Sequence, residues 1–403
     1  MIDFLYSKKG STSVFLVMIL SSVLLLVGLF IHAASQAAGR SCTDAVLDLA
    51  GRSVLSEYDI PLQNRYGIFA FHTDEREAEE KLKYYAEYSF HDNALKEVLR
   101  RNRHMDLLKL DLESVNVDLK GYSITDTDLF EQQILAHMKY DILGAVGERP
   151  DLKASSAEDI VLKNEKVINS LPSRGYSSGI LTDLERIVKN GIPDLKEIEQ
   201  TAKNTFLVDE YLMRHFGNHC RSAEARETFF INEVEYVLKG NHSDQRNYSA
   251  VRTDLFLVRN VLNLIHINSD SEKRQAVSVI AAALTLARGE KIAAPIVAEA
   301  WAAAEAENDL RLLEDGKQVA FIKKKENWAV PISETLEYLW KDDYITPKTV
   351  RGYDYEDYLR VLLFLENREK KLLRCMDLIQ LNMQGSYRRD FDFRQYYGGV
   401  QFK

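Results

Sequence analysis

Proline and cysteine are both scarce in this chain, with seven prolines and three cysteines among 403 residues. Few prolines leave long stretches able to continue as helices, because proline removes a backbone donor and clashes with the preceding helical turn. Cys42, Cys220 and Cys375 form no CxxC motif and allow at most one disulfide. A chain of this length can bury a core without disulfides. The composition therefore predicts a mainly helical protein.

Familiar motifs of enzymes and nucleotide-binding proteins are also missing. The sequence contains no GxxxxGK[ST] loop, no GxGxxG after a strand and no HExxH. Residues 175–179 match the letters GxSxG, but they belong to a loop-like stretch, Ser173 to Gly179, and not to the strand-to-helix turn of a nucleophile elbow. The net charge of −9 and a pI near 5.6 argue against a nucleic-acid partner, which calls for a clustered basic surface. We expect a protein that is not an enzyme and that uses no cofactor.

Charge is nearly absent between Ser11 and Ala34, where His32 is the only ionisable side chain. About 20 apolar residues are enough for a helix to cross the ~30 Å hydrocarbon core of a membrane. Residues 11–34 are therefore predicted to form one transmembrane helix. The alternative is a signal peptide cleaved near Ser35 or Ala37. Secretory apolar regions run about 7–15 residues, so the longer run here favours an uncleaved anchor.

The charges that flank this helix predict its orientation. The pair Lys8-Lys9 precedes the helix, and positive charge favours the cytoplasmic side, which places residues 1–10 in the cytoplasm. Arg40 and Arg52 follow the helix, but long domains are translocated largely regardless of charge. We expect a single-pass protein of the cell membrane with its body outside the cytoplasm.

The anchor is predicted to continue beyond the membrane as one helix from about residue 11 to 58, since no proline occurs before Pro61. Apolar and small side chains keep a spacing of three and four along this extension. They are Cys42, Ala45, Val46, Leu49 and Ser53, with Leu47, Ala50 and Val54 beside them. We expect Leu47, Leu49, Val54 and Leu55 to pack into the folded body.

Further along the chain, apolar alternation and turn residues predict short strands. The predicted strands cover residues 66–71, 115–121, 316–322, 390–394 and 399–402. Thr73-Asp74 is predicted to cap a charged helix that runs to about Arg103, and residues 354–384 are predicted to form one strong helix. The alanine-dense segments 281–283 and 293–306 are expected to form core helices of a bundle.

These elements predict an α+β fold that is mainly α. A small sheet built from both ends of the chain would hold a helical insertion, broken near residues 144–150, 171–179, 191–193 and 240–242. The predicted organisation is a cytoplasmic N-terminus over residues 1–10, a transmembrane helix over 11–34, a helix extension and first part of the body over 35–124, a helical subdomain over 125–315, and the remaining part of the body over 316–403.

His215, His219 and Cys220 form the best candidate for a metal site, because two histidines four apart share a helix face and a thiolate follows. Gly217-Asn218 interrupts that helix pattern. We therefore predict that these residues hold no metal.

Paired carboxylates are the side chains of acid–base catalysis, and Glu233 with Glu235 and Asp342-Asp343 are the candidates. Charged residues make up 28% of the chain, so such pairs arise freely, and a solvated face is favoured. Tyrosines could line a ligand groove, but packing in a core or interface is favoured. The tyrosines concerned are Tyr353, Tyr355, Tyr358, Tyr396 and Tyr397.

The N-terminal region, with residues 8–15, a single apolar helix, residues 55–59 and residues 66–70, resembles the pseudopilin-like proteins of tight-adherence (Tad, Flp-type) pilus systems. The resemblance is closest to a poorly characterised branch of TadE- and TadG-like membrane proteins of Gram-positive bacteria. It extends over most of the chain, through the segments 230–240, 300–305 and 358–382. These segments carry packing motifs and indicate no reaction.

The resemblance implies a structural or accessory component of a Tad-like pilus or secretion apparatus, with other membrane components of that apparatus and the lipid bilayer as partners. Small residues permit close helix approach in lipid, and Ser21, Ser22 and Gly28 are the candidates for such contacts. Gly10 matches the glycine of a prepilin processing site. Prepilins carry Glu five residues later, where this chain has Phe15, which argues against processing and against a role as major pilin.

Two functions from other classes remain as alternatives to the pilus-associated role. One is a membrane-tethered protein of the cell envelope that binds a ligand or acts as a sensor. The other is an envelope hydrolase that uses carboxylates of the body.

Overall fold

The computed structural model describes residues 9–91, 112–141, 159–175, 195–221, 227–338 and 343–398. Helices dominate these residues, and a two-stranded sheet pairs β1 (Phe71–His72) with β2 (Tyr396–Tyr397). This architecture confirms the predicted mainly helical α+β class. The sheet joins segments from near both ends of the chain, as predicted.

The chain divides into two compact units. Unit 1 contains residues 1–59, 71–122 and 397–403, and unit 2 contains residues 60–70 and 123–396. The division near residue 122 lies close to the boundary predicted at 124. The segment 316–396, however, belongs with the helical middle of the chain and not with residues 35–124.

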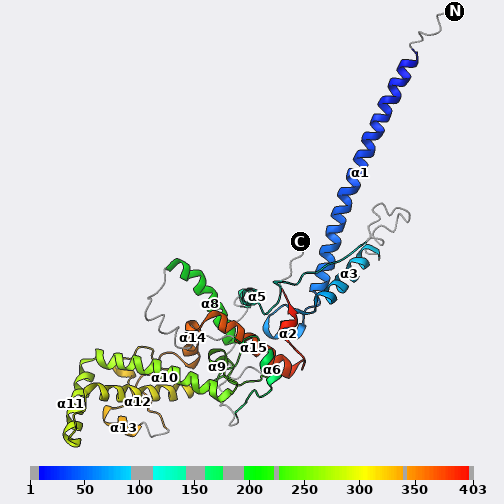
Figure 1. Ribbon diagram of the computed structural model, residues 1–403. Coiled ribbons are helices and arrows are strands. Elements are labelled where there is room, and N and C mark those ends of the chain that lie inside the picture. Colours follow the sequence, from blue (N-terminus) through cyan, green and yellow to red (C-terminus); the bar gives the residue numbers. More distant parts are fainter. Residues whose placement is uncertain are drawn as a thin grey trace, which may run out of the picture. The chain divides into compact units, whose positions relative to one another are not determined.

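Unit 1 is built on α1 (Lys9–Leu55), a continuous helix of 47 residues, and α3 (Glu75–His91), which packs beside its C-terminal end (Figure 1). At a rise of about 1.5 Å per residue α1 is roughly 70 Å long. The predicted continuous helix is confirmed, with its end at Leu55. Val46 and Ala50 are buried against Ala86 of α3.

The face of α1 that packs is narrower than predicted. Val46, Ala50 and Val54 are 5%, 0% and 4% exposed and follow one another every four residues. Leu47 and Leu49 are 37% and 53% exposed, so the prediction that they enter the core was wrong. A single helix, α3, covers one stripe of α1 and leaves residues on either side of that stripe in solvent.

The start of α3 was predicted correctly. The side chain of Asp74 accepts a hydrogen bond from the backbone N–H of Glu77 at 2.8 Å, as an N-cap residue does. Lys81 of α3 bridges Glu77 and Glu57 at 3.0 and 2.9 Å, and so ties α3 to the chain just after α1. The predicted extension to Arg103 lies outside the described residues.

Most of the predicted strands are not strands in the structure. Residues 115–121 form none, because the N–H of Val117 donates to the Glu79 side chain at 3.2 Å instead of to a neighbouring strand. Tyr66 ends the helix α2 (Ile60–Tyr66). After it, Gln133 takes the place of a partner strand by bonding both the N–H and the carbonyl of Phe69, at 3.0 and 2.8 Å.

The C-terminal strand predictions were also largely wrong. Residues 316–322 contribute one isolated bridge, in which Val319 and Tyr353 exchange two backbone hydrogen bonds of 2.9 Å. Residues 393–395 form the short 3-10 helix η3 (Phe393–Gln395), whose Phe393 is buried. Residues 399–402 lie outside the described part of the chain.

Helices make up most of unit 2, as predicted. Among the described residues between 125 and 315, the helices are α5 (Thr127–Asp141), α6 (Glu165–Ser170), α8 (Leu195–His215), α9 (Glu233–Lys239), α10 (Asp244–Ser269), α11 (Ser271–Arg288) and α12 (Ala294–Glu314). Later elements are η1 (Lys325–Asn327), η2 (Ile332–Glu334), α13 (Thr335–Tyr338), α14 (Tyr355–Leu365) and α15 (Arg368–Ser386). The predicted break at 240–242 is confirmed, and Gly240 adopts the left-handed conformation (φ 67°) that ends α9.

The helix predicted over residues 354–384 is in fact two helices. Glu366-Asn367 separates α14 from α15, and the Asn367 side chain accepts the N–H of Lys370 at 3.2 Å. Asn is a strong N-cap because its side chain satisfies a free backbone donor at the helix start. The sequence predicted one helix because apolar residues keep a helical spacing both before and after this break.

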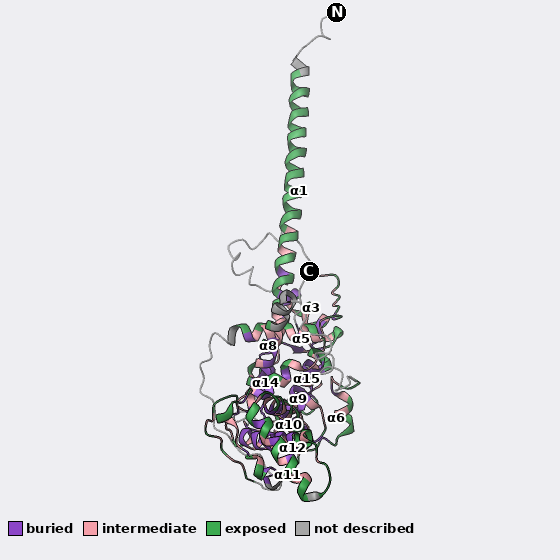
Figure 2. Cartoon of the chain, turned by 90° about the vertical axis from the view of Figure 1, so that its left-hand side faces the viewer, coloured by how far each residue is buried: buried purple, intermediate pink, exposed green. Residues whose placement is uncertain are grey.

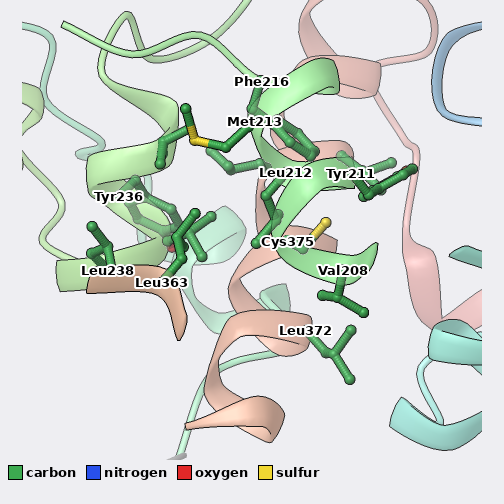
Figure 3. Close-up of a cluster of buried hydrophobic side chains, with 14 of the residues drawn as sticks. Val208, Tyr211, Leu212, Met213, Phe216, Tyr236, Leu238, Leu363, Leu372 and Cys375 are labelled. Carbon is green, nitrogen blue, oxygen red and sulfur yellow. The ribbon is translucent and has the colours of Figure 1, made fainter. Parts of the chain in front are cut away.

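The main core of unit 2 lies among α8, α9, α14 and α15 (Figure 3). Val208 and Leu212 of α8, four residues apart, meet Leu372 and Cys375 of α15. A separate cluster joins α10, α11 and α12, where α12 buries Ala298, Ala302, Ala304 and Ala306 as predicted for a bundle helix. In α11, by contrast, Ala282 and Ala283 are exposed.

Candidate functional site

The first half of α1 is the most distinctive functional candidate in the described part of the chain. Its most apolar 18 residues have a mean hydropathy of 3.0 and none of them is buried, as Figure 2 shows along the helix. Leu25 and Leu16 are 74% and 67% exposed. The helix is therefore long and apolar enough to cross a membrane, as predicted.

The candidates for contact with partner helices lie within this exposed stretch. The hydroxyl groups of Ser21 and Ser22 donate to the carbonyls of Val17 and Ile19, at 2.6 and 2.8 Å, so the helix itself satisfies them. No described atom lies within 4 Å of a Cβ added at Gly28. Contact with a partner helix there stays a prediction. Gly10 lies in the first turn of α1, and its processing is likewise untested.

The structure directs the three residues of the metal candidate toward different neighbours. His215 ends α8 and lies 3.1 Å from His137, Nε2 to Nε2. His219 stacks on Tyr248, with ring centroids 3.7 Å apart. The Cys220 thiol donates to the carbonyl of Leu313 at 3.7 Å. The expected helix break at Gly217 is present, and that His215, His219 and Cys220 hold no metal stays a prediction.

Glu233 and Glu235 are buried, so the prediction of a solvated face was wrong for this pair. Each carboxylate accepts a backbone N–H of the loop after α8: Glu233 that of Gly217 at 2.8 Å and Glu235 that of His219 at 2.9 Å. Asn382 also donates to Glu233, at 2.6 Å. These carboxylates hold the loop against α9.

The environment of Glu235 favours the neutral acid. Burial raises the pKa of its carboxyl to about 7, although Tyr355 donates to Oε1 at 2.8 Å, and Oε2 is buried without a hydrogen-bond partner. Burial also raises the pKa of the neighbouring Cys220 thiol to about 12, so little thiolate forms at neutral pH. Burial lowers the pKa of His219. The cluster thus pairs the weak acid Glu235 with the protonated thiol of Cys220. This thiol is not activated as a nucleophile.

The other acidic and aromatic candidates differ in exposure. Asp342 lies outside the described residues, and Asp343 is exposed, as predicted for a solvated face, while its backbone carbonyl accepts Arg311 Nη1 at 2.9 Å. Tyr355, Tyr358 and Tyr396 are buried, which agrees with the predicted packing role. Tyr353 is 51% exposed, although its ring meets Tyr358 edge-on at 6.5 Å. Tyr397 is half-buried.

A buried network of four charged side chains between α10 and α12 was not predicted. Arg259 of α10 donates to Asp309 of α12 at 2.9 Å and to the carbonyl of Phe321 at 2.9 Å. Lys323 donates to Asp309 at 2.6 Å and pairs with Glu305. All four side chains are 5% exposed or less.

The Glu305 carboxylate also accepts the N–H groups of Ala329 and Val330, at 2.9 and 2.7 Å. The network therefore fixes the chain after α12 onto the bundle. The sequence does contain one indication of this network: Glu305 and Asp309 lie four residues apart in an alanine-rich helix. Acidic residues on an apolar helix face require partners when they are buried. Their partners, Arg259 and Lys323, lie in other segments of the chain, and the apolar spacing of the sequence does not predict which segments come into contact.

Comparison with known proteins gives one match, a family of unknown function (DUF5702), over residues 147–403. The chain belongs to the DUF5702 family. No curated protein and no solved structure matches it. The DUF5702 region includes α8, α9, the buried carboxylates and the charged network, and it begins after α1.

Proposed function

We propose that this DUF5702 protein is a single-pass, membrane-anchored component of a Tad-like pilus or secretion apparatus, with a structural or accessory role and its body outside the cytoplasm. The observation that supports this role is the division of α1 into two halves. Its first half is exposed and apolar, and its second half buries Val46, Ala50 and Val54. Such a helix transmits its position in a membrane directly to unit 1.

A flexible tether would be enough for a protein that only needs to stay near the membrane. A continuous helix with no break between lipid and body instead suits a protein whose body takes a defined position relative to membrane partners. The basic pair Lys8-Lys9 supports a cytoplasmic N-terminus. The membrane-tethered ligand-binding alternative is supported by a pocket of unit 2 that Arg174, Lys370 and Arg374 line.

A photo-crosslinking amino acid at Leu25 tests the proposed contacts in cells. Leu25 lies on the face of α1 that carries Ser21 and Gly28, and the matched control position, Val23, lies on the opposite face. We expect the probe at Leu25 to crosslink to specific membrane proteins that purify with a secretion ATPase and polytopic assembly proteins, and the probe at Val23 to do so much less.

Mass spectrometry of the crosslinked and co-purified proteins gives the readout. Crosslinks to lipid alone, with no secretion or pilus component in the purified material, would contradict the proposed function. Equal crosslinking from Leu25 and Val23 would contradict the assignment of the Ser21 and Gly28 face.

A further inference from the structure

A pocket of about 270 Å³ in unit 2 has a wall of cations. The cations are Arg174, Lys370 and Arg374; His242 also lines the pocket, and none of the described residues that line it is acidic. The whole chain carries 61 acidic and 52 basic residues, so this grouping runs against its average composition. Grouped cations of this kind are typical of sites that bind anions.

The fold holds Arg374 in place from two sides. Its Nη1 donates to the carbonyl of Val237 at 2.9 Å, near the C-terminus of α9. Gly240, which ends α9 with φ 67°, brings its backbone so close that an added Cβ would lie 2.5 Å from Arg374 Nε. Only glycine satisfies both requirements. The guanidinium is thus positioned before any ligand arrives.

Two carboxylates lie next to the wall, and both already accept hydrogen bonds. Glu366 accepts Lys370 Nζ at 2.7 Å. Asp377 accepts the backbone N–H of Ser173 and the hydroxyl of Tyr236, each at 3.0 Å, and burial raises its pKa to about 6. Lys370 is 3% exposed, and its burial lowers the pKa of its amino group. The positive charges of Arg374 and Lys239 lower this pKa further. Because Lys370 is buried and paired with Glu366, the guanidinium groups of Arg174 and Arg374 are the main positive charges that the wall presents to the pocket.

A second pocket of about 390 Å³ shares Gly240 and His242 with the first. Apart from Val161, its other lining residues are polar: Asn241, Ser243, Arg246 and Asp159. Asp159 accepts the Ser243 hydroxyl and the N–H of Gln245, at 2.8 and 3.0 Å. Amide, hydroxyl and carboxylate groups of this kind bind hydroxyl groups.

We propose that the cation-lined pocket binds the phosphate group of a phosphate ester whose hydroxyl-bearing part occupies the neighbouring pocket. Guanidinium groups match a phosphate in charge and in the geometry of paired hydrogen bonds, which favours Arg174 and Arg374 as its main contacts. All the residues concerned lie in the region that the DUF5702 family model matches. The site does not depend on the proposed role in a pilus or secretion apparatus.

Isothermal titration calorimetry of the full chain in a non-ionic detergent tests this site, with inorganic phosphate, glucose 6-phosphate, glucose and citrate as probes. We expect saturable binding of inorganic phosphate and tighter binding of glucose 6-phosphate. Arg174→Gln and Arg374→Gln should each weaken both by about tenfold or more, the loss of one charge-assisted contact. Arg274→Gln is the matched control, because Arg274 is exposed and also donates to a backbone carbonyl, that of Asn268 at 3.1 Å.

The site would be overturned by any of these results: no saturable binding of either phosphate compound, unchanged affinity in Arg174→Gln, or citrate binding as tightly as glucose 6-phosphate. Arg174 is exposed, so its replacement leaves the fold intact even if Arg374→Gln does not. Glucose binding as tightly as glucose 6-phosphate would also contradict the role of the cations.

Discussion

Replacing Asp309 with alanine is expected to lower the free energy of unfolding of unit 2 by about 3–5 kcal/mol. Asp309 is the carboxylate that Arg259 and Lys323 share, and its own side chain is 1% exposed. Without it, two buried cations lose a partner, and Glu305 alone cannot neutralise both. Breaking a buried pair on one side is costly because the remaining charge stays in a medium of low polarity.

Chemical denaturation followed by tryptophan fluorescence measures this change, since Trp301 and Trp328 lie in the same helical bundle. The matched control is Asp390→Ala, which removes an ion pair with Arg388 at 2.9 Å, with Asp390 77% exposed. Exposed pairs contribute about 0–1 kcal/mol, so this variant should unfold almost as the wild type does. Equal effects of Asp309→Ala and Asp390→Ala would contradict the stabilising role of the network.

The second large effect is expected at the contact between α1 and α3. Ala50→Asp places a carboxylate in the buried stripe against Ala86, and we expect it to detach α3 from α1 at a cost of several kcal/mol. Leu49→Asp, one residue away but 53% exposed in the wild type, is the matched control. Hydrogen exchange of the backbone amides of α3 should rise strongly in the first variant and stay unchanged in the second.

Shortening the chain tests the same contact by a different route. A chain that begins near Gly39 keeps Val46, Ala50 and Val54, whereas one that begins at Tyr58 loses all three. Each buried aliphatic side chain contributes roughly 1.5–3 kcal/mol when it is as large as valine. Unit 1 should therefore fold in the longer chain and fail in the shorter one. Identical protection of α3 in both chains would show that α1 is only a tether.

The helices of this protein could be predicted well because their signals are local. The continuation of α1 to Leu55 followed from an apolar stripe and the absence of proline before Pro61. The start of α3 followed from Asp74, and the end of α9 from Gly240. In each case a few neighbouring residues determine the backbone conformation, and no distant partner is needed.

The strands could not be predicted in the same way, because a strand needs a partner that the local pattern does not specify. Val117 alternates with polar residues as in a strand, yet its N–H bonds the side chain of Glu79. The backbone N–H of Phe69 donates to the side chain of Gln133, which lies 64 residues further along the chain. The apolar–polar alternation of a sequence looks the same whether a neighbouring strand or a side chain supplies the hydrogen bonds to its backbone. Alternation alone therefore does not predict a strand.

The polar interior was the other feature that sequence alone did not reveal. Glu233 and Glu235 were predicted to lie on the surface because the chain is rich in charge. Both are instead buried and accept hydrogen bonds from backbone N–H groups of the loop after α8. Their burial follows from the tertiary position of α9 within the core, which composition does not encode. The cationic pocket likewise joins Arg174, 200 residues before Arg374, with the turn at Gly240.

We propose that α1 anchors the protein in the cell membrane with the body outside the cytoplasm. A cysteine at the exposed position Lys325, whose side chain is 74% exposed, tests it in a Cys42→Ser background, since the remaining Cys220 and Cys375 are buried. We predict that a membrane-impermeant maleimide labels Lys325→Cys in intact cells and that the labelled protein sediments with membranes. Labelling that appears only after lysis, or labelled protein in the soluble fraction, would contradict the claim.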